Sequence, residues 1–294
     1  MATLQEWVQG ARPRTLPAAI APVAVGTGLA YAMRDANPGY ALLALVVSLA
    51  LQVGVNYAND YSDGIRGTDD VRVGPVRLVG QRLAQPGNVK LAAFLAFGVA
   101  GLAGLTLITL SNTPWLLLIG ALAIIAAWKY TGGKNPYGYL GLGEVFVFIF
   151  FGLVAVLGTT YTQTKHLDGA SWASACGVGA IACAVLVANN LRDIPGDTES
   201  GKRTLAVRLG DPATRVLYVV LVLASAACVV IAAQTYEWAY LGLIALLAAV
   251  VPVRTVVTGR KGRDLIPALA GTGMFLLAYG VLLGLGLYLT YRLA

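Results

Sequence analysis

The stretch GYALLALVVSLALQVGVNYAN, residues 39–59, is long and apolar enough to cross a bilayer as a single helix. The hydrocarbon core of a membrane is about 30 Å thick, and a helix needs about 20 apolar residues to span it. No charged residue interrupts the run, which ends in Asn56 and Asn59 directly before Asp60. We therefore predict a transmembrane helix whose last turn carries polar groups into water.

Similar apolar runs recur along the rest of the chain. Together they predict nine transmembrane helices, over residues 15–33, 39–59, 90–111, 114–130, 141–161, 171–192, 213–234, 238–258 and 265–290. Of the 294 residues 57% are hydrophobic and only 12% are charged, whereas a soluble domain carries roughly a quarter charged residues. The composition excludes an ordinary soluble enzyme and predicts an all-α, polytopic membrane bundle that forms one domain over residues 1–294.

The positive charges predict how this bundle is oriented. When Lys and Arg are assigned to alternate sides of nine spans, 18 of the 21 fall on one side, which leaves Arg34, Lys165 and Arg292 on the other. Cytoplasmic connections retain positive charge during insertion. We therefore expect a cytoplasmic amino terminus, an external carboxyl terminus, and chemistry in the long cytoplasmic segments 60–89 and 193–212. The basic loops also account for the net charge of +7, and no basic soluble domain remains to bind nucleic acid.

The first long cytoplasmic segment begins with a cluster of oxygen donors. Asn56, Asp60 and Asp63 are spaced i, i+4 and i+7, so they lie on one face of a helix. Stacked carboxylates repel one another unless a cation lies between them, and Mg²⁺ prefers such hard oxygen ligands together with substrate phosphates. The alternative is a helix end that merges into a polar loop, although acids at a helix carboxyl end oppose the macrodipole.

A second cluster follows another span on the same side. Asn189 and Asn190 precede Asp193 and Asp197, whose spacing of four residues again favours a shared helical face. Pro195 lies between them, so we expect the helix to break near this point. Basic residues follow both clusters: Arg66, Arg72 and Arg77 come after the first, and Lys202 and Arg203 come after the second. Metal-binding carboxylates beside guanidinium and ammonium groups suit a diphosphate, although each basic residue could equally belong to a solvated loop.

These motifs, on nine spans, make the chain resemble the UbiA superfamily of intramembrane prenyltransferases. Within it, the sequence is most similar to 1,4-dihydroxy-2-naphthoate polyprenyltransferases of menaquinone synthesis, through residues 11–17 (ARPRTLP), 59–63 (NDYSD), 67–69 (GTD), 74–79 (GPVRLV) and 201–210 (GKRTLAVRLG). The resemblance implies a first metal and diphosphate motif at Asn56, Asp60 and Asp63. It implies a second at Asp193 and Asp197.

Two other features of the sequence bear on this resemblance. The superfamily often has a further Asp four residues after Asp63, where this chain has Gly67, so Asp69 and Asp70 are candidates to compensate. The remaining cytoplasmic connection, residues 130–144, is similar to the corresponding family loop. There Lys134 is a candidate for contact with diphosphate or with a substrate carboxylate, and Tyr139 could shield a cation with its ring face. A snorkelling Lys and an interfacial Tyr are the alternative interpretation.

The remaining acidic and imidazole side chains have no role in this scheme. Glu144 enters an apolar run, where a carboxylate is costly enough to suggest a function or a partner, and we do not assign it to catalysis. The single histidine, His166, is expected outside, which removes histidine as a general base.

The resemblance implies an enzyme of the bacterial plasma membrane whose active site faces the cytoplasm. The reaction would be Mg²⁺-dependent transfer of a polyprenyl group from polyprenyl diphosphate to 1,4-dihydroxy-2-naphthoate, with loss of CO₂ and diphosphate. Alternatives are another aromatic acceptor such as 4-hydroxybenzoate, or a cation-coupled transporter, although acids clustered at one face argue against transport. A CDP-alcohol phosphotransferase is disfavoured, because its motif begins at residues 60–64 but does not continue. The sequence leaves the oligomeric state and the length of the prenyl chain open.

Overall fold

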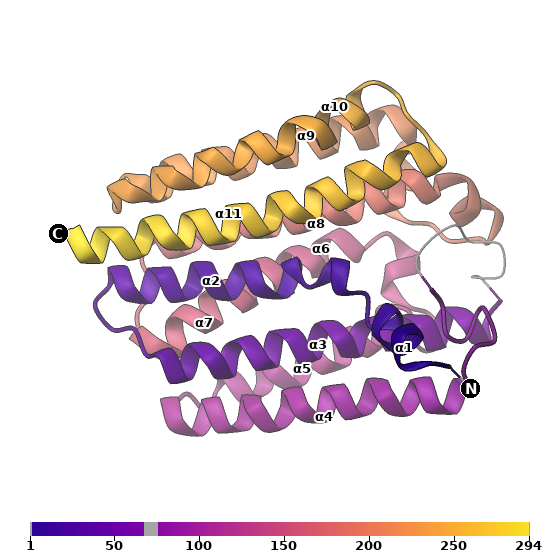
Figure 1. Ribbon diagram of the computed structural model, residues 1–294, viewed down its shortest axis with the longest axis horizontal. Helices are drawn as coiled ribbons and strands as arrows, with labels where there is room; N and C mark the ends of the chain where they lie inside the picture. The colour runs from indigo at the N-terminus through magenta and orange to yellow at the C-terminus, as the bar shows by residue number, and fades with distance from the viewer. Residues whose placement is uncertain (1, 68–75, 294) are drawn as a thin grey trace.

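A computed structural model describes residues 2–67 and 76–293, and these form a bundle of helices without strands (Figure 1). The elements are α1 (Leu4–Gly10), η1 (Pro13–Thr15), α2 (Pro17–Ala32), α3 (Pro38–Ile65), α4 (Pro86–Ser111), α5 (Leu116–Lys129), η2 (Tyr137–Leu140), α6 (Gly143–Val147), η3 (Phe148–Val154), α7 (Ala155–Thr164), α8 (Gly169–Glu199), α9 (Leu205–Ala233), η4 (Glu237–Ala245), α10 (Leu246–Val257), η5 (Gly262–Leu265) and α11 (Ile266–Leu293). The all-α membrane fold predicted from the sequence is confirmed.

Each of the nine predicted stretches is helical, but they differ in length. In the described part of the chain, seven helices are long and apolar enough to cross a membrane. An eighth is obtained if residues 4–15 and α2, which meet at a bend of 49°, count as one span. The ninth stretch is α5, whose 14 residues extend only about 21 Å at 1.5 Å per residue.

Helix α8 occupies the centre of the bundle, and 72% of its most apolar window is buried, against 22% for α4 at the edge. It packs against α9, α11 and the π-helical segment η3, while α2 packs along α11 and α3 along α4. Glycines permit the closest approaches, because a Cβ atom on Gly28 of α2 would lie 2.6 Å from the carbonyl oxygen of Gly284 in α11. Small residues of this kind let membrane helices come into backbone contact.

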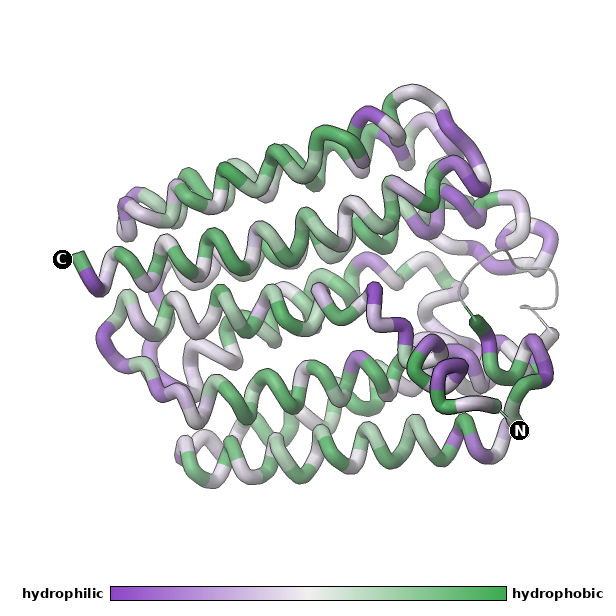
Figure 2. Tube along the Cα trace, in the orientation of Figure 1, coloured by the Kyte–Doolittle hydropathy of each residue, from purple (hydrophilic) through white to green (hydrophobic). Residues whose placement is uncertain are grey.

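The long connections lie together at one end of the bundle. Figure 1 shows the segments after α3, α5, α8 and α10 at the end that also holds α1, while the carboxyl terminus lies at the opposite end. Figure 2 shows hydrophilic residues concentrated at this polar end and in the short turns opposite, with apolar helices between. The long, polar connections predicted from the sequence therefore lie together at one end of the molecule.

The predicted break at Pro195 is wrong. Helix α8 runs through Pro195 and ends at Glu199. Pro195 has no backbone N–H, so it removes one hydrogen bond from the helix. It lies near the carboxyl end of a long helix, where few further hydrogen bonds depend on that turn. Asp193 and Asp197 therefore keep their i, i+4 relation on one continuous helix. The distortions occur elsewhere, at the π-helical η3 and at Gly210 in α9, whose φ of 76° interrupts that helix.

Candidate functional site

The first acidic motif occupies the last turns of α3, and its most buried member is Asp60. This side chain is 0% exposed. Its Oδ2 accepts the backbone N–H of Leu78 at 2.7 Å, and its Oδ1 accepts that of Val79 at 3.1 Å. The carboxylate therefore fastens the connection before α4 to the end of α3, and Arg77, which precedes these donors, is only 7% exposed.

The asparagines of the motif face different neighbours. Asn56 donates through Nδ2 to the carbonyl oxygen of Ala11 and to Oγ1 of Thr15, both at 2.9 Å. Asn59 accepts through Oδ1 from Oγ1 of Thr131 at 2.7 Å. Asn56 thus anchors the segment before α2, whereas Asn59 anchors the connection after α5. Local spacing did not assign a role to Asn59, because its partner Thr131, in the connection after α5, is 72 residues away.

Asp63 lies at the junction of the two motifs. It is 3% exposed, and its Oδ1 accepts a hydrogen bond of 2.5 Å from the hydroxyl of Tyr139. The same oxygen lies 3.9 Å from Nζ of Lys202, in the turn after α8. Nζ of Lys202 also lies 4.5 Å from the ring centroid of Tyr139, and the guanidinium of Arg66 lies 5.4 Å from it. Asp63 and Tyr139 therefore gather two cations around one aromatic ring, as the cation–π geometry favours.

The second motif lies at the end of α8. Asp193 accepts from Nε of its neighbour Arg192 at 2.6 Å and from Nη2 at 2.7 Å, and Nη2 also contacts Oδ1 of Asn189 at 2.9 Å. Helical spacing did not identify Arg192 as a partner of Asp193, because successive residues on a helix do not normally face each other.

Asp197 connects the second motif to the first. It is 7% exposed, and its carbonyl oxygen accepts the N–H of Lys202 at 2.8 Å. Its Oδ2 lies 3.5 Å from Oγ1 of Thr204. Lys202 is thus fixed to Asp197 through its backbone and reaches Asp63 through its side chain, so the ends of α3 and α8 meet at one place.

Three other residues predicted to bind substrate have exposed side chains. Arg66 is exposed and donates to the carbonyl oxygens of Thr131 and Gly133. Lys134 and the side chain of Arg203 are exposed as well, although the N–H of Arg203 donates to the carbonyl oxygen of Tyr139 at 2.9 Å. Arg72, Asp69 and Asp70 lie outside the described residues.

The connection between α5 and α6 holds Tyr139 in place. The hydroxyl of Tyr137 donates to the carbonyl oxygen of Ala126 at 2.9 Å, and its ring stacks on Phe146 with 3.9 Å between centroids. Burial raises the pKa of Tyr137 above its ordinary value, so this phenol remains a neutral donor. Arg208 donates to the carbonyl oxygen of Leu140 at 2.9 Å and ties the same connection to α9.

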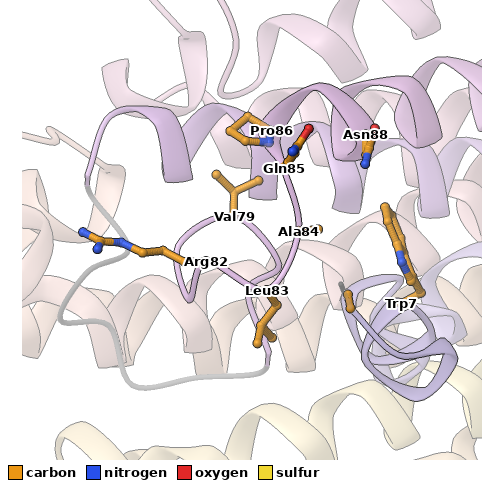
Figure 3. Close-up of a pocket in the computed structure, with 9 residues that line it drawn as sticks. Trp7, Val79, Arg82, Leu83, Ala84, Gln85, Pro86 and Asn88 are labelled. Atoms are coloured by element: carbon orange, nitrogen blue, oxygen red, sulfur yellow. The ribbon is translucent and has the colours of Figure 1, made fainter.

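A cavity of about 690 Å³ lies next to this site. Figure 3 shows Trp7 of α1 on one side of it and Arg82 on the other, with Val79, Leu83 and Ala84 between them and with Gln85, Pro86 and Asn88 at the start of α4. None of the acidic motif residues lines it. It is connected to the site through Val79, whose N–H binds Asp60, and through Leu83 and Ala84, whose N–H groups donate to the carbonyl oxygen of Leu78.

These features define a multi-pass membrane protein with a polar site where two acidic helix ends and several cations meet. The chain belongs to the UbiA prenyltransferase family, which it matches over residues 19–279, and is therefore a membrane prenyltransferase.

The comparisons with individual proteins agree with this family. The chain is 54% identical over 281 residues to a 1,4-dihydroxy-2-naphthoate octaprenyltransferase of Mycobacterium tuberculosis, which covers 96% of each chain. It is 37% identical over 295 residues to the Escherichia coli protein of the same name, covering 97% of this chain and 96% of the relative. A solved UbiA homologue from Archaeoglobus fulgidus, bound to DMAPP and Mg²⁺, shares the fold with a TM-score of 0.62 and 16% identity over 96% of this chain and 99% of its own.

Proposed function

We propose that this protein transfers a polyprenyl group from polyprenyl diphosphate to 1,4-dihydroxy-2-naphthoate, with release of diphosphate and CO₂, in menaquinone biosynthesis. The observation that carries the acceptor is the 54% identity, over 96% of both chains, to a relative named for that reaction. The diphosphate is supported by the junction of Asp63, Lys202 and Asp197, which joins carboxylates and a cation from two distant motifs.

The donor chemistry of the junction fits Mg²⁺. Asp63 and Asp197 are buried carboxylates, and Asp193 lies one helical turn from Asp197. Over residues 2–67 and 76–293, no three His, Cys, Asp or Glu side chains form one metal-binding group. Mg²⁺ does not require such a group, because it keeps several waters and is commonly held by one or two carboxylates together with substrate phosphates. We therefore assign the cation to Asp63 from α3 and to Asp193 and Asp197 from α8.

Asn56 and Asp60, which belong to the same predicted metal motif, have a different task in this proposal. Their side chains bind backbone groups of Ala11, Leu78 and Val79. Those contacts hold the segments before α2 and α4 against α3. We assign Asn56 and Asp60 to shaping the walls of the diphosphate site.

The chain's own cations complete this site. Lys202 and Arg66 lie beside Tyr139 near the end of α3, and Arg77 directly precedes Leu78, which binds Asp60. Lys134 and Arg203 lie exposed on the neighbouring connections. Guanidinium and ammonium groups bind phosphate oxygens through charge-assisted hydrogen bonds. Bound Mg²⁺ would neutralise charge on the leaving diphosphate as the allylic carbon–oxygen bond breaks.

The acceptor chemistry needs no strong protein base at the substituted carbon. The bond from the ring to its carboxylate breaks as the new carbon–carbon bond forms, and its electron pair restores the aromatic ring. The position of His166, the single histidine, is consistent with this, because it lies in the turn before α8, at the end of the bundle opposite the polar end. The face of Tyr139 would shield the allylic cation, and the apolar bundle would exclude water from it.

A hollow between apolar helices supports a path for the prenyl chain. An apolar hollow of about 440 Å³ lies between α2, α3 and α11, lined by residues such as Val23, Leu45 and Gly284. Its α3 and α11 residues lie in the halves of those helices that are remote from the diphosphate site. We assign it to part of the prenyl tail.

We further propose that all nine helices cross the bilayer of a bacterial plasma membrane, with the polar end in the cytoplasm. Although α5 is short, it carries the chain from Thr113, which contacts Ser111 at the far end, to Thr131, which binds Asn59 at the polar end. Helices before and after it run between the same two ends (Figure 1). The 18 positive charges then face the cytoplasm, as insertion favours.

One assay tests the reaction. Purified protein is incubated with radiolabelled polyprenyl diphosphate and either 1,4-dihydroxy-2-naphthoate or 4-hydroxybenzoate, with Mg²⁺ or with EDTA. We expect a prenylated naphthoquinol and an equal amount of CO₂, only with the naphthoate and only with the metal. Preference for 4-hydroxybenzoate would contradict the acceptor assignment, and full turnover in EDTA would contradict the metal assignment.

A further inference from the structure

Glu144 is a buried carboxylate beside the proposed site that the diphosphate chemistry does not use. It begins the span formed by α6, η3 and α7, and is 8% exposed. Its Oε1 accepts from Nδ2 of Asn190 at 2.9 Å, whereas its buried Oε2 has no hydrogen-bond partner among the residues that the structure describes. A buried acceptor without a donor costs about 1–3 kcal/mol, so a ligand that donates to it would recover that free energy.

The position of Glu144 along α8 is fixed by its partner. Asn190 precedes Asp193 by three residues and Asp197 by seven, so all three lie on the same helical face. At 1.5 Å per residue, Asn190 is about 4.5 Å from Asp193 and about 10 Å from Asp197 along the axis, toward the middle of the bundle. A diphosphate held at the end of α8 points its allylic carbon in that direction. Glu144 therefore lies at the depth where the acceptor ring must meet the allylic carbon.

The surroundings hold Glu144 firmly in this position. Sγ of Cys183 donates to its carbonyl oxygen at 3.1 Å. Further along the same span, a Cβ atom on Gly152 of η3 would lie 2.6 Å from Cα of Gly179, so the span and α8 are in backbone contact. The π-helical segment η3 begins four residues after Glu144, at Phe148, and such segments frequently occur at functional sites.

The chemistry of the two substrates selects the one that Glu144 can bind. A carboxylate offers only hydrogen-bond acceptors, so Oε2 requires a donor. The polyprenyl diphosphate carries an apolar tail and phosphate oxygens, which repel a carboxylate. The aromatic acceptor is the substrate that carries hydroxyl donors. We propose that Oε2 of Glu144 accepts a hydrogen bond from a ring hydroxyl of the aromatic acceptor and so orients its ring toward the allylic carbon. This inference rests on the proposed function.

Such a contact would contribute to the reaction as well as to binding. A hydroxyl that donates to a carboxylate releases electron density into the ring, which favours attack on the allylic cation. The carboxylate of the acceptor would be turned away from Glu144 by like charge. Asn190 is then a positioning residue, because it holds Oε1 and leaves Oε2 for the substrate.

The test compares Glu144→Gln with Glu237→Gln, the same change at an exposed site in the first turn of η4 at the other end of the bundle. In Glu144→Gln the amide oxygen can still accept from Asn190, while an NH₂ group replaces Oε2. We expect the KM for 1,4-dihydroxy-2-naphthoate to rise about 10- to 100-fold, which is the effect of losing a hydrogen bond to a charged group. Binding of radiolabelled polyprenyl diphosphate without acceptor should remain within about twofold of the unaltered protein. Glu237→Gln should change neither quantity.

Acceptor analogues identify the group that Glu144 contacts. Inhibition constants are measured for 1-hydroxy-2-naphthoate and 4-hydroxy-2-naphthoate, each of which lacks one hydroxyl, and for 1,4-dihydroxynaphthalene, which lacks the carboxylate. For one of the two hydroxyl-deleted analogues, the inhibition constant should be the same with the unaltered protein and with Glu144→Gln. Such non-additivity marks a direct contact. The proposal would be overturned if Glu144→Gln raised the inhibition constants of both hydroxyl-deleted analogues and left that of 1,4-dihydroxynaphthalene unchanged.

The remaining outcomes also decide the question. An unchanged acceptor KM in Glu144→Gln would overturn the proposal while leaving the proposed function in place. Loss of polyprenyl diphosphate binding in that variant would show a structural role and would overturn it too. Failure of the unaltered protein to prenylate the naphthoate at all would instead contradict the proposed function, and the inference with it.

Discussion

Substitution of Asp60 tests whether this carboxylate binds the metal or anchors the backbone of the connection before α4. Both of its oxygens accept backbone N–H groups, from Leu78 at 2.7 Å and from Val79 at 3.1 Å, in a fully buried place. In Asp60→Asn the amide oxygen can accept one of these donors, while its NH₂ group faces the other. Hydrogen bonds to a charged group contribute about 1.5–3 kcal/mol each, so we expect the substitution to weaken the docking of this connection by about 2–4 kcal/mol.

That loss is measurable as local opening. Arg77 is 7% exposed, so trypsin reaches the bond after it only when the connection undocks. A loss of about 2–4 kcal/mol raises the open population roughly 30- to 1,000-fold. The rate of cleavage after Arg77, followed by mass spectrometry at low protease concentration, should rise in proportion while opening and closing remain fast. The KM for polyprenyl diphosphate should rise as well, and the Mg²⁺ concentration for half-maximal rate should change little.

Gly64 offers a matched control that leaves the carboxylate intact. A Cβ atom at Gly64 would lie 2.5 Å from Cγ1 of Val79 and 3.1 Å from the backbone nitrogen of Gly80, so Gly64→Ala pushes the same connection away from α3. We expect it to reproduce the proteolysis and the KM of Asp60→Asn. Asp63→Asn should instead raise the Mg²⁺ requirement. If Asp60→Asn raises the Mg²⁺ requirement as Asp63→Asn does, while Gly64→Ala does not, Asp60 is a metal ligand and the reasoning is refuted.

Two further predictions test the junction and the orientation. Tyr139→Phe keeps the aromatic ring near Lys202 and Arg66 but removes the 2.5 Å hydrogen bond to Asp63. Because that hydroxyl competes with Mg²⁺ for the Asp63 carboxylate, the Mg²⁺ concentration for half-maximal rate should fall by up to about tenfold. A rise would show instead that the hydroxyl prepares Asp63 for the metal. In a protein without its three cysteines, Glu199→Cys should react with an impermeant maleimide only from the cytoplasmic side and Glu237→Cys only from outside; the reverse pattern would invert the proposed topology.

The sequence by itself determined the class of fold and predicted where its chemistry lies. Apolar runs such as residues 39–59 specify membrane helices locally, since each must satisfy its own backbone hydrogen bonds in lipid. The uneven distribution of Lys and Arg predicted that the long connections would share one end, and the structure gathers them there (Figure 2). The motifs around Asp63 and Asp197 were likewise visible as local spacings of polar residues in otherwise apolar spans.

Only the tertiary structure decided what each polar residue touches. Asp60 and Asp63 are three residues apart, yet one binds backbone 18 residues away and the other a tyrosine 76 residues away. Glu144 finds Asn190 across 46 residues, and the break expected at Pro195 does not occur within α8. Local periodicity determines which face of a helix a side chain occupies, but its partner depends on which other helix packs against that face. In this bundle that choice rests on close approaches such as Gly28 with Gly284 and Gly152 with Gly179, because lipid is as apolar as the helix surfaces and shape decides their pairing.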